Sequence, residues 1–153
     1  MENTNVIRIL NNKKINFIIH DYSNTSFVKA KDAANYLNIE ENKLFKTLVT
    51  KSKFNFYDFV VPSSNELDLK KAAKAVNEKK IEMIPQKDLY PLTGYVHGGC
   101  SPIGMKKQYK TFIDKSAEEL STICISGGWI GYTIEISPNE LKKVINFDFC
   151  DLI

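Results

Sequence analysis

The stretch LFKTLVTKSKFNFYDFVVP, at residues 44–62, contains two short segments that are rich in β-branched and aromatic residues. This composition is typical of β-strands, so we predict one strand at residues 44–50 and a second at residues 54–61. The linker between them, Lys51-Ser52-Lys53, suits a hairpin turn although it contains no glycine. Residues 44–61 are therefore predicted to form a β-hairpin.

Helices and strands are predicted on both sides of this hairpin. On its N-terminal side, Asn3 or Thr4 caps a helix, a strand covers residues 17–22, and an alanine-rich helix covers residues 29–38. On its C-terminal side we predict a helix from Asp68 to Asn77, a strand at 80–84, a helical turn at 85–89, and a helix that opens with the capping box 137–140 and continues through Ile145.

The interleaving of these elements indicates an α+β fold. Several strands are sequence neighbours joined as hairpins, so we expect a mixed, largely antiparallel sheet that is curled, barrel-like and covered by helices. The sequence contains no internal repeat and no linker rich in proline, glycine or serine. Its 153 residues are enough for a hydrophobic core, so residues 1–153 are expected to form a single domain.

Composition limits the class of protein more than its activity. The net charge of +3 permits contact with a nucleic acid but does not demand it. The N-terminus lacks the pattern of a signal peptide, and no segment approaches the roughly 18 apolar residues that cross a bilayer. Cys100, Cys124 and Cys150 are odd in number and form no CxxC pair, which favours reduced thiols. We therefore expect a cytoplasmic protein without membrane contact.

The seven glycines fall into two segments, TGYVHGGCSPIG at residues 93–104 and SGGWIG at residues 126–131. Glycine allows positive φ and lets a ligand approach backbone N–H groups, which suits an oxyanion or a phosphate. Turns and bulges between strands are the simpler explanation of the same glycines. The segments are candidate ligand loops, and Lys106 and Lys107, directly after the first, are the lysines best placed for phosphates.

Lys46 interrupts an apolar strand, and this position allows two interpretations. A lysine in such a run usually extends its amine to the surface. At the end of a strand in a cleft, however, its ammonium could hold a phosphate or stabilise a developing negative charge. The residues alone do not decide between these interpretations.

The sequence gives little support for a metal site, for a known nucleotide-binding or hydrolase motif, or for a cysteine nucleophile. His20 and His97 lack metal-ligand spacing, so we expect no metal and no cofactor. The sequence has no GxSxG elbow, Walker A loop or GxGxxG fingerprint. Cys100 with His97 could form a nucleophile pair, but no third group is evident to orient it, so a packing thiol is favoured.

With these residues in view, the chain resembles the YbaK/ProX family of aminoacyl-tRNA deacylases, which is related to the editing domain of bacterial prolyl-tRNA synthetase. The resemblance extends nearly end to end. It rests on TNVIRILNNKKI, His20-Asp21-Tyr22, LFKTLV at 44–49, ELDLKK at 66–71, KKIEM at 79–83, TGY at 93–95, GGCSPIGMKK at 98–107, SGG at 126–128 and IEI at 134–136.

This resemblance implies a YbaK-like fold and hydrolysis of the ester between an amino acid and the 3′ adenosine of tRNA. It implies that Lys46 is the essential lysine, and that Tyr22 and Phe27 are aromatic residues near the pocket. Thr133 stands where family members often have aspartate, so this chain lacks a carboxylate there. The remaining substrate-binding positions are those of the two glycine loops: Gly98, Gly99, Ser101, Pro102, Gly104, Ser126, Gly127 and Gly128.

The motifs are most similar to the subgroup that clears cysteine from proline tRNA. In that subgroup the substrate's own thiol attacks its ester, so no protein nucleophile is needed. Two alternatives remain open: an alanyl-tRNA(Pro) deacylase that uses a bound water, and a catalytically silent module that binds tRNA or prolyl-tRNA synthetase. The implied partners are the 3′ acceptor end of aminoacyl-tRNA and, as a further possibility, the synthetase.

Overall fold

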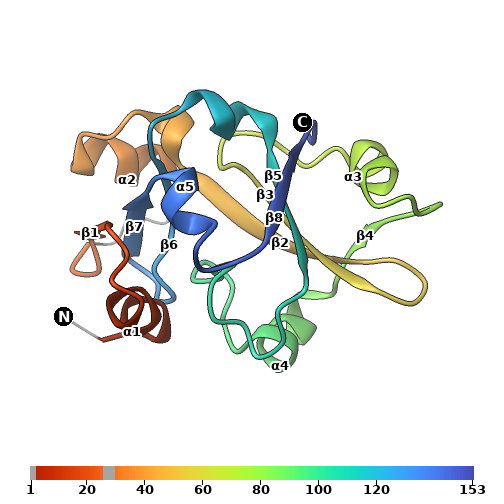
Figure 1. The fold of residues 1–153 in the computed structure, drawn as a ribbon, viewed down its shortest axis with the longest axis horizontal. Helices are drawn as coiled ribbons and strands as arrows, with labels where there is room; N and C mark the ends of the chain where they lie inside the picture. Colours follow the sequence, from red (N-terminus) through yellow and green to blue (C-terminus); the bar gives the residue numbers. More distant parts are fainter. Residues whose placement is uncertain (1–2, 26–29) are drawn as a thin grey trace.

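The computed structural model describes residues 3–25 and 30–153 and contains two β-sheets with helices packed around them (Figure 1). One sheet has three strands in the order β1-β7-β6, and the other has five in the order β4-β2-β3-β5-β8. The strands are β1 (Ile18–Asp21), β2 (Phe45–Lys51), β3 (Phe56–Pro62), β4 (Glu82–Met83), β5 (Lys110–Asp114), β6 (Ile123–Ser126), β7 (Tyr132–Ile136) and β8 (Phe147–Cys150).

The predicted hairpin is confirmed at the centre of the larger sheet. Strands β2 and β3 pair antiparallel with Leu48 opposite Phe59. The turn is longer than predicted and lies at residues 52–55, where the Ser52 N–H donates to the Asn55 carbonyl at 2.8 Å. Strand β3 then pairs in parallel with β5, and β5 in parallel with β8. The sheet is therefore mixed, as expected.

The expected barrel-like closure is wrong. Leu44 and Cys124 form an isolated bridge between the sheets, but no continuous ladder joins them in the described ranges 3–25 and 30–153. The predicted strand at 80–84 is reduced to the two residues of β4, which pair only with the end of β2. Because this outer strand is so short, the larger sheet ends in an open edge and the two sheets stay separate.

The helices follow most of the predicted signals. They are α1 (Asn5–Asn12), α2 (Ala30–Leu37), α3 (Leu69–Ala75), α4 (Leu89–Thr93) and α5 (Pro138–Leu141), with short 3₁₀ turns η1 (Glu41–Lys43), η2 (Gln86–Asp88) and η3 (Lys115–Glu119). Thr4, Asp68 and Ser137 each accept a backbone N–H at a helix start, so the predicted caps are confirmed. Helix α5 stops at Leu141 rather than at Ile145, because the chain continues as turns toward β8.

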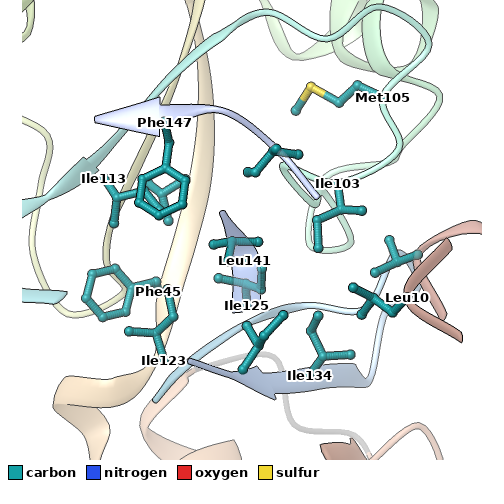
Figure 2. Close-up of a cluster of buried hydrophobic side chains, with 14 of the residues drawn as sticks. Leu10, Phe45, Ile103, Met105, Ile113, Ile123, Ile125, Ile134, Leu141 and Phe147 are labelled. Atoms are coloured by element: carbon teal, nitrogen blue, oxygen red, sulfur yellow. The ribbon is translucent and has the colours of Figure 1, made fainter. Parts of the chain in front are cut away.

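The main core fills the space between the two sheets. Figure 2 shows Leu10 of α1, Ile125 of β6 and Phe147 of β8 in one cluster, although they come from distant parts of the sequence. A second cluster, with Phe59 and Phe112 stacked at 5.6 Å, covers the opposite face of the larger sheet under α3. No helix among the described residues is long and apolar enough to cross a membrane.

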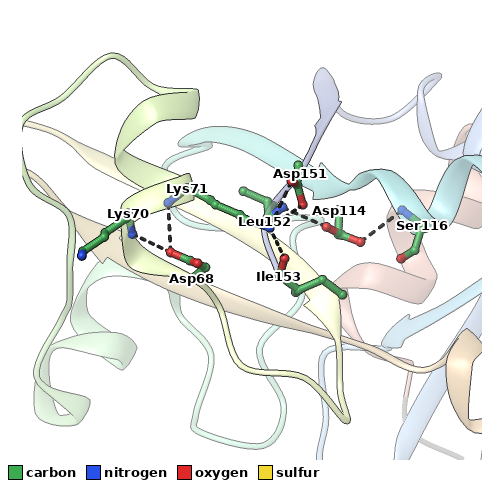
Figure 3. A network of polar contacts seen from close by, with 8 residues as sticks. All are labelled: Asp68, Lys70, Lys71, Asp114, Ser116, Asp151, Leu152 and Ile153. Carbon is green, nitrogen blue, oxygen red and sulfur yellow. Dashed lines mark hydrogen bonds and ion pairs between the residues drawn. The ribbon is translucent and has the colours of Figure 1, made fainter.

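One ion pair and several hydrogen bonds fix the end of the chain (Figure 3), and we call them the C-terminal network: Asp68, Lys71, Asp114, Asp151 and the backbone of residues 151–153. The Asp114 carboxylate accepts the Leu152 N–H at 2.9 Å and the Ser116 N–H at 3.1 Å. Lys71 pairs with Asp151 at 3.0 Å and also donates to the Ile153 carbonyl. The network therefore ties β8 to the rest of the larger sheet.

Candidate active site

A cavity of about 320 Å³ opens where β2 of the larger sheet meets β6 of the smaller one. Strand β2 forms one wall, and the segment 97–100 forms another. Strands β6 and β7 and helix α2 complete the enclosure. The lining residues are Tyr22, Ala33, Leu37, Leu44, Phe45, Lys46, Thr47, Leu48, Ser63, Leu89, His97, Gly98, Cys100, Cys124, Ile125, Ser126, Tyr132 and Thr133.

Lys46 is the cation of this cavity. It lies near the start of β2 opposite Val61, after the buried residue Phe45, and its own side chain is partly exposed. Within the part of the chain that the structure describes, no carboxylate forms an ion pair with its amine. The ammonium is therefore available to an anionic group that enters the cavity.

The segment 97–100 contributes lining residues to the same cavity, and its backbone N–H groups are candidate donors. Gly98 has φ of 90°, which favours glycine, and it lines the cavity beside Cys100. The Gly99 N–H donates to the Val96 carbonyl at 3.0 Å, so it is already used by the turn. Among the described residues, no acceptor contacts the N–H groups of Gly98 and Cys100. These two donors can serve a carbonyl oxygen on which charge develops.

The Cys100 thiol is not prepared for nucleophilic attack. Burial raises its pKa to about 12, and the nearby Asp58 carboxyl raises it further. A thiol with this pKa stays protonated at neutral pH. His97 also lines the cavity, but its ring has no hydrogen-bond partner among the described residues, so nothing there orients it as a base.

Ser126 and Thr133 bring two hydroxyl groups into the cavity from paired strands. They lie directly opposite each other in the β6–β7 ladder, so both side chains project from the same face of the sheet. The Ser126 hydroxyl accepts the Gly128 N–H at 3.1 Å, which leaves its own hydrogen free to donate. The pair can bind a polar group such as an amine, a hydroxyl or water.

A partly buried ion-pair network borders the cavity on this sheet face. Glu135 accepts hydrogen bonds from Thr122 at 2.5 Å, from His20 at 2.8 Å and from Lys43 at 3.1 Å. These contacts, that of Thr122 first, lower the pKa of Glu135 to about 2. The network joins β1, β6 and β7 to the segment that leads into β2.

The same network tests the expectation that the protein binds no metal. His20, Cys124 and Glu135 place potential ligand atoms within 4.8 Å of one another. However, Lys43 already neutralises Glu135, and burial raises the pKa of the Cys124 thiol to about 12. A cation would have to displace the lysine and deprotonate the thiol, so the geometry fits an ion-pair network better than a metal site.

The structure brings five of the predicted site residues to the cavity wall, namely Tyr22, Lys46, Gly98, Ser126 and Thr133. It places the others elsewhere. Ser101 and Pro102 are buried, and Gly99 and Gly127 sit in turns. Gly104 and Gly128 pack against α1, where a side chain would meet Ile9 or Val6. Phe27 lies outside the described residues. The glycine loops are therefore partly lining and partly structural.

Several lining residues were not predicted from the sequence. Leu89, Ser63 and Thr47 belong to three different elements, and each looks like an ordinary core or turn residue in the sequence. The Thr47 hydroxyl is buried and has no partner among the described residues. A threonine in an apolar strand does not identify a cavity-lining residue in the sequence, because threonine is also common in strands for its β propensity alone.

Comparisons with known proteins identify the family of the chain. Residues 25–144 match the model of a family described as the aminoacyl-tRNA editing domain. A protein of Enterococcus faecalis with the provisional name Cys-tRNA(Pro)/Cys-tRNA(Cys) deacylase EbsC is 39% identical over 153 residues, which cover 99% of this chain and 93% of the relative.

More distant similarities are to a proline–tRNA ligase and to a solved structure. A proline–tRNA ligase of a Thermoanaerobacter species is 24% identical over 132 residues, which cover 78% of this chain but only 23% of the ligase. A crystal structure provisionally described as a trans-editing enzyme for prolyl-tRNA synthetase superposes with a TM-score of 0.84 at 24% identity, over 96% of this chain and 93% of that one. This last similarity supports a shared fold.

Proposed function

Because the chain belongs to the aminoacyl-tRNA editing domain family, we propose that it deacylates mischarged tRNA in trans, with cysteinyl-tRNA(Pro) as the preferred substrate. In this proposal residues 1–153 act as a single deacylase domain in the cytoplasm. The partner is the 3′ acceptor end of the tRNA, and prolyl-tRNA synthetase is a candidate second partner. No cofactor is required.

The observation that supports the proposal is the shared cavity, which is lined by Lys46, Gly98 and Cys100. The Lys46 ammonium and the N–H groups of Gly98 and Cys100 have no partner among the described residues. The ester carbonyl oxygen lies against the N–H groups of Gly98 and Cys100, where negative charge that develops on the oxygen is stabilised. Lys46 binds the phosphate or ribose end of the tRNA, or shares that negative charge. The hydroxyl groups of Ser126 and Thr133 hold the amino group of the aminoacyl residue.

The bond-breaking step uses the substrate's own thiol. Its sulfur attacks the ester carbon, the carbon–oxygen bond to the terminal ribose breaks, and the thiol proton is passed to the ribose oxygen. The products are a cyclic thiolactone and tRNA with a free 3′ end. This route agrees with the protonated Cys100 thiol and with a His97 ring that has no hydrogen-bond partner in the ranges 3–25 and 30–153, because it needs no protein nucleophile.

One observation favours an alternative substrate. The hydroxyl groups of Thr47, Ser126 and Thr133 all line the cavity and are suited to hold a water molecule. A bound water at this position could attack alanyl-tRNA(Pro), whose side chain has no nucleophile.

A deacylation panel tests the proposal. Purified protein is incubated with tRNA(Pro) that carries cysteine, alanine, proline or 2-aminobutyrate, the last of which replaces the cysteine thiol with a methyl group of similar size. We expect rapid loss of the cysteinyl ester and little loss of the 2-aminobutyryl ester. Equal rates for these two would contradict attack by the thiol, and loss of the alanyl ester alone would establish the water-dependent alternative.

A further inference from the structure

Three exposed apolar side chains lie on loops next to the cavity wall. Val96, Trp129 and Ile130 are 49%, 54% and 55% exposed. They belong to two loops that touch each other, because the Gly99 backbone lies against Trp129 and Ile130, and Gly98 faces the Ile130 side chain. We call these three residues the mouth patch.

The mouth patch borders the opening of the cavity. Gly98, which lines the cavity, belongs to the same loop as Val96, and Ser126, another lining residue, ends strand β6 directly before the loop that carries Trp129 and Ile130. The Tyr22 N–H donates to the Gly131 carbonyl at 2.8 Å, which places a third lining residue at the end of the Trp129 loop. A ligand that fills the cavity and extends outward between these loops passes over the patch.

The loop that carries Trp129 has a fixed conformation. The Tyr132 N–H donates to the Trp129 carbonyl at 3.1 Å, and the Gly127 N–H donates to the Tyr132 carbonyl at 2.8 Å. Gly128 and Gly131 have φ of 89° and 91°, which other residues rarely adopt. The indole is therefore presented to solvent on a hydrogen-bonded turn, so little conformational entropy is lost when a ligand stacks on it.

From this placement we propose that the mouth patch is a stacking platform for the unpaired nucleotides at the 3′ end of tRNA. The inference rests on the proposed function. If the ester lies in the cavity, the terminal adenosine and the nucleotide before it emerge at the opening. Unpaired bases have flat apolar faces that stack on aromatic side chains regardless of sequence. An exposed tryptophan, next to Ile130 in the sequence and on a loop that contacts the loop of Val96, matches this chemistry.

A positively charged side chain packs against the segment that leads to Val96. The Lys106 side chain packs beside Gly94, two residues before Val96, and its amine lies 5.1 Å from the centroid of the Tyr90 ring. This ammonium is suited to contact the phosphates that link the stacked nucleotides. Charge and apolar surface together favour a nucleic acid over a purely apolar partner.

Trp129 is the single tryptophan of the chain, so its fluorescence reports on the platform alone. The probe is an acceptor-stem RNA hairpin that carries no amino acid and has an unpaired 3′ end. It is compared, at the same salt concentration, with an identical hairpin whose 3′ end is blunt. We expect stacking to quench Trp129 emission with the first RNA and to leave it nearly unchanged with the second. Equal quenching by both RNAs would contradict the proposal, and so would an absence of quenching.

Variants then measure the contribution of the platform to binding. Because these variants lack the tryptophan, binding is measured by the fluorescence anisotropy of a dye-labelled RNA. Replacing Trp129 with alanine should weaken binding of the unpaired end by roughly fivefold to a hundredfold, while Trp129→Phe, which keeps an aromatic face, should retain most of it. The matched control is Phe54→Ala. Phe54 is 83% exposed but lies at the tip of the β2–β3 hairpin, several strand residues beyond Leu48 of the cavity wall (Figure 1). Loss of binding in this control equal to that in Trp129→Ala would overturn the assignment.

The design separates this inference from the proposed function. If the wild type hydrolyses no ester but the unpaired RNA quenches Trp129, the function fails and the platform stands. If the wild type deacylates tRNA while Trp129 does not respond, only the platform fails. Quenching by purified prolyl-tRNA synthetase without RNA, together with no response to RNA, would identify a protein-docking surface and overturn the proposal.

Discussion

In the C-terminal network the charged atoms of Lys71 and Asp114 have close partners, whereas in the cavity Lys46 has none among the described residues. The backbone shows the same contrast. The Leu152 N–H is bonded to Asp114, while the N–H of Gly98, beside the cavity, has no acceptor among the residues described.

This difference indicates which polar groups stabilise the fold and which are available to bind a ligand. A satisfied polar network contributes to folding, because its loss leaves buried groups without partners. Polar groups left free in a cavity contribute little to folding but can bind a ligand. The two regions should therefore respond to mutation in opposite ways, and the following substitutions test that contrast.

The largest effect is expected at Lys46. Replacing it with alanine should lower kcat/KM for cysteinyl-tRNA(Pro) by about a hundredfold to a thousandfold, because an electrostatic contact to the reacting end of the substrate is lost. The midpoint of urea unfolding should change little, since the lysine has no ion partner among the described residues. Initial rates and urea titrations measure the two quantities.

Lys51 provides the matched control for this substitution. It lies on the same strand, β2, but does not line the cavity. Lys51→Ala removes the same charge from the molecule and should leave kcat/KM within about twofold, because a partly exposed charge outside the cavity is largely screened by solvent and salt. A folded Lys46→Ala protein that turns over like the wild type would remove Lys46 from the mechanism.

The reverse result is expected in the C-terminal network. Asp114→Ala removes the acceptor of the Leu152 and Ser116 N–H groups, so the free energy of unfolding should fall by about 3 kcal/mol. Turnover per folded molecule should stay near the wild-type value. Asp148→Ala, at an exposed position on β8, serves as the control and should change stability by less than about 0.5 kcal/mol. A stable Asp114→Ala protein with low turnover would contradict the contrast.

Local signals explain which parts of this arrangement could be predicted from the sequence. The hairpin at residues 44–61 and the caps at Thr4, Asp68 and Ser137 depend on neighbouring residues, and the structure contains them. The parallel pairing of β3 with β5 joins residues about fifty positions apart, and no local sequence pattern predicts it. The barrel-like closure was wrong for the same reason, since closure depends on which distant edges meet.

The candidate site shows the same limit. Lys46, Gly98 and Ser126 come from motifs that stand out in the sequence, and the structure brings them to one cavity. The partners of Glu135 could not be predicted, because Thr122, His20 and Lys43 are separated along the chain and meet only through strand pairing. The role of Gly104 and Gly128 could not be predicted either. Glycine is favoured both where the backbone packs closely against a helix and where a ligand approaches it, so the residue type does not distinguish the two roles.

Asp58 sharpens the contrast because it is an unsatisfied polar group outside the cavity wall. It is fully buried on β3, and its Oδ1 has no partner among the described residues. Burial raises the pKa of Asp58 to about 8, compared with 3.8 in the unfolded chain. Between these values the unfolded state has lost its proton and the folded state has kept it, so rising pH favours unfolding.

Asp58→Asn tests this reasoning, because the amide cannot ionise. From about pH 5 to pH 7 the stability of the wild type relative to this variant should fall by at most about 1.4 kcal/mol per pH unit. The difference should level off above the folded-state pKa. Urea unfolding at several pH values measures it. Parallel stability curves for the two proteins would show that the carboxyl is ionised in the folded state.

The smallest effect is expected for Cys100→Ala, which decides whether a side chain of the cavity attacks the ester. Burial raises the pKa of the Cys100 thiol to about 12, so almost none of it is thiolate at neutral pH. We therefore expect kcat/KM to stay within about threefold of the wild type, whereas loss of a true nucleophile or base lowers it by about a hundredfold or more. His97→Ala should behave similarly, since nothing among the described residues orients its ring. If either variant were as inactive as Lys46→Ala while still folded, the free donors of the cavity would be secondary to a Cys100–His97 pair, and the substrate's own thiol would no longer be needed as the attacking group.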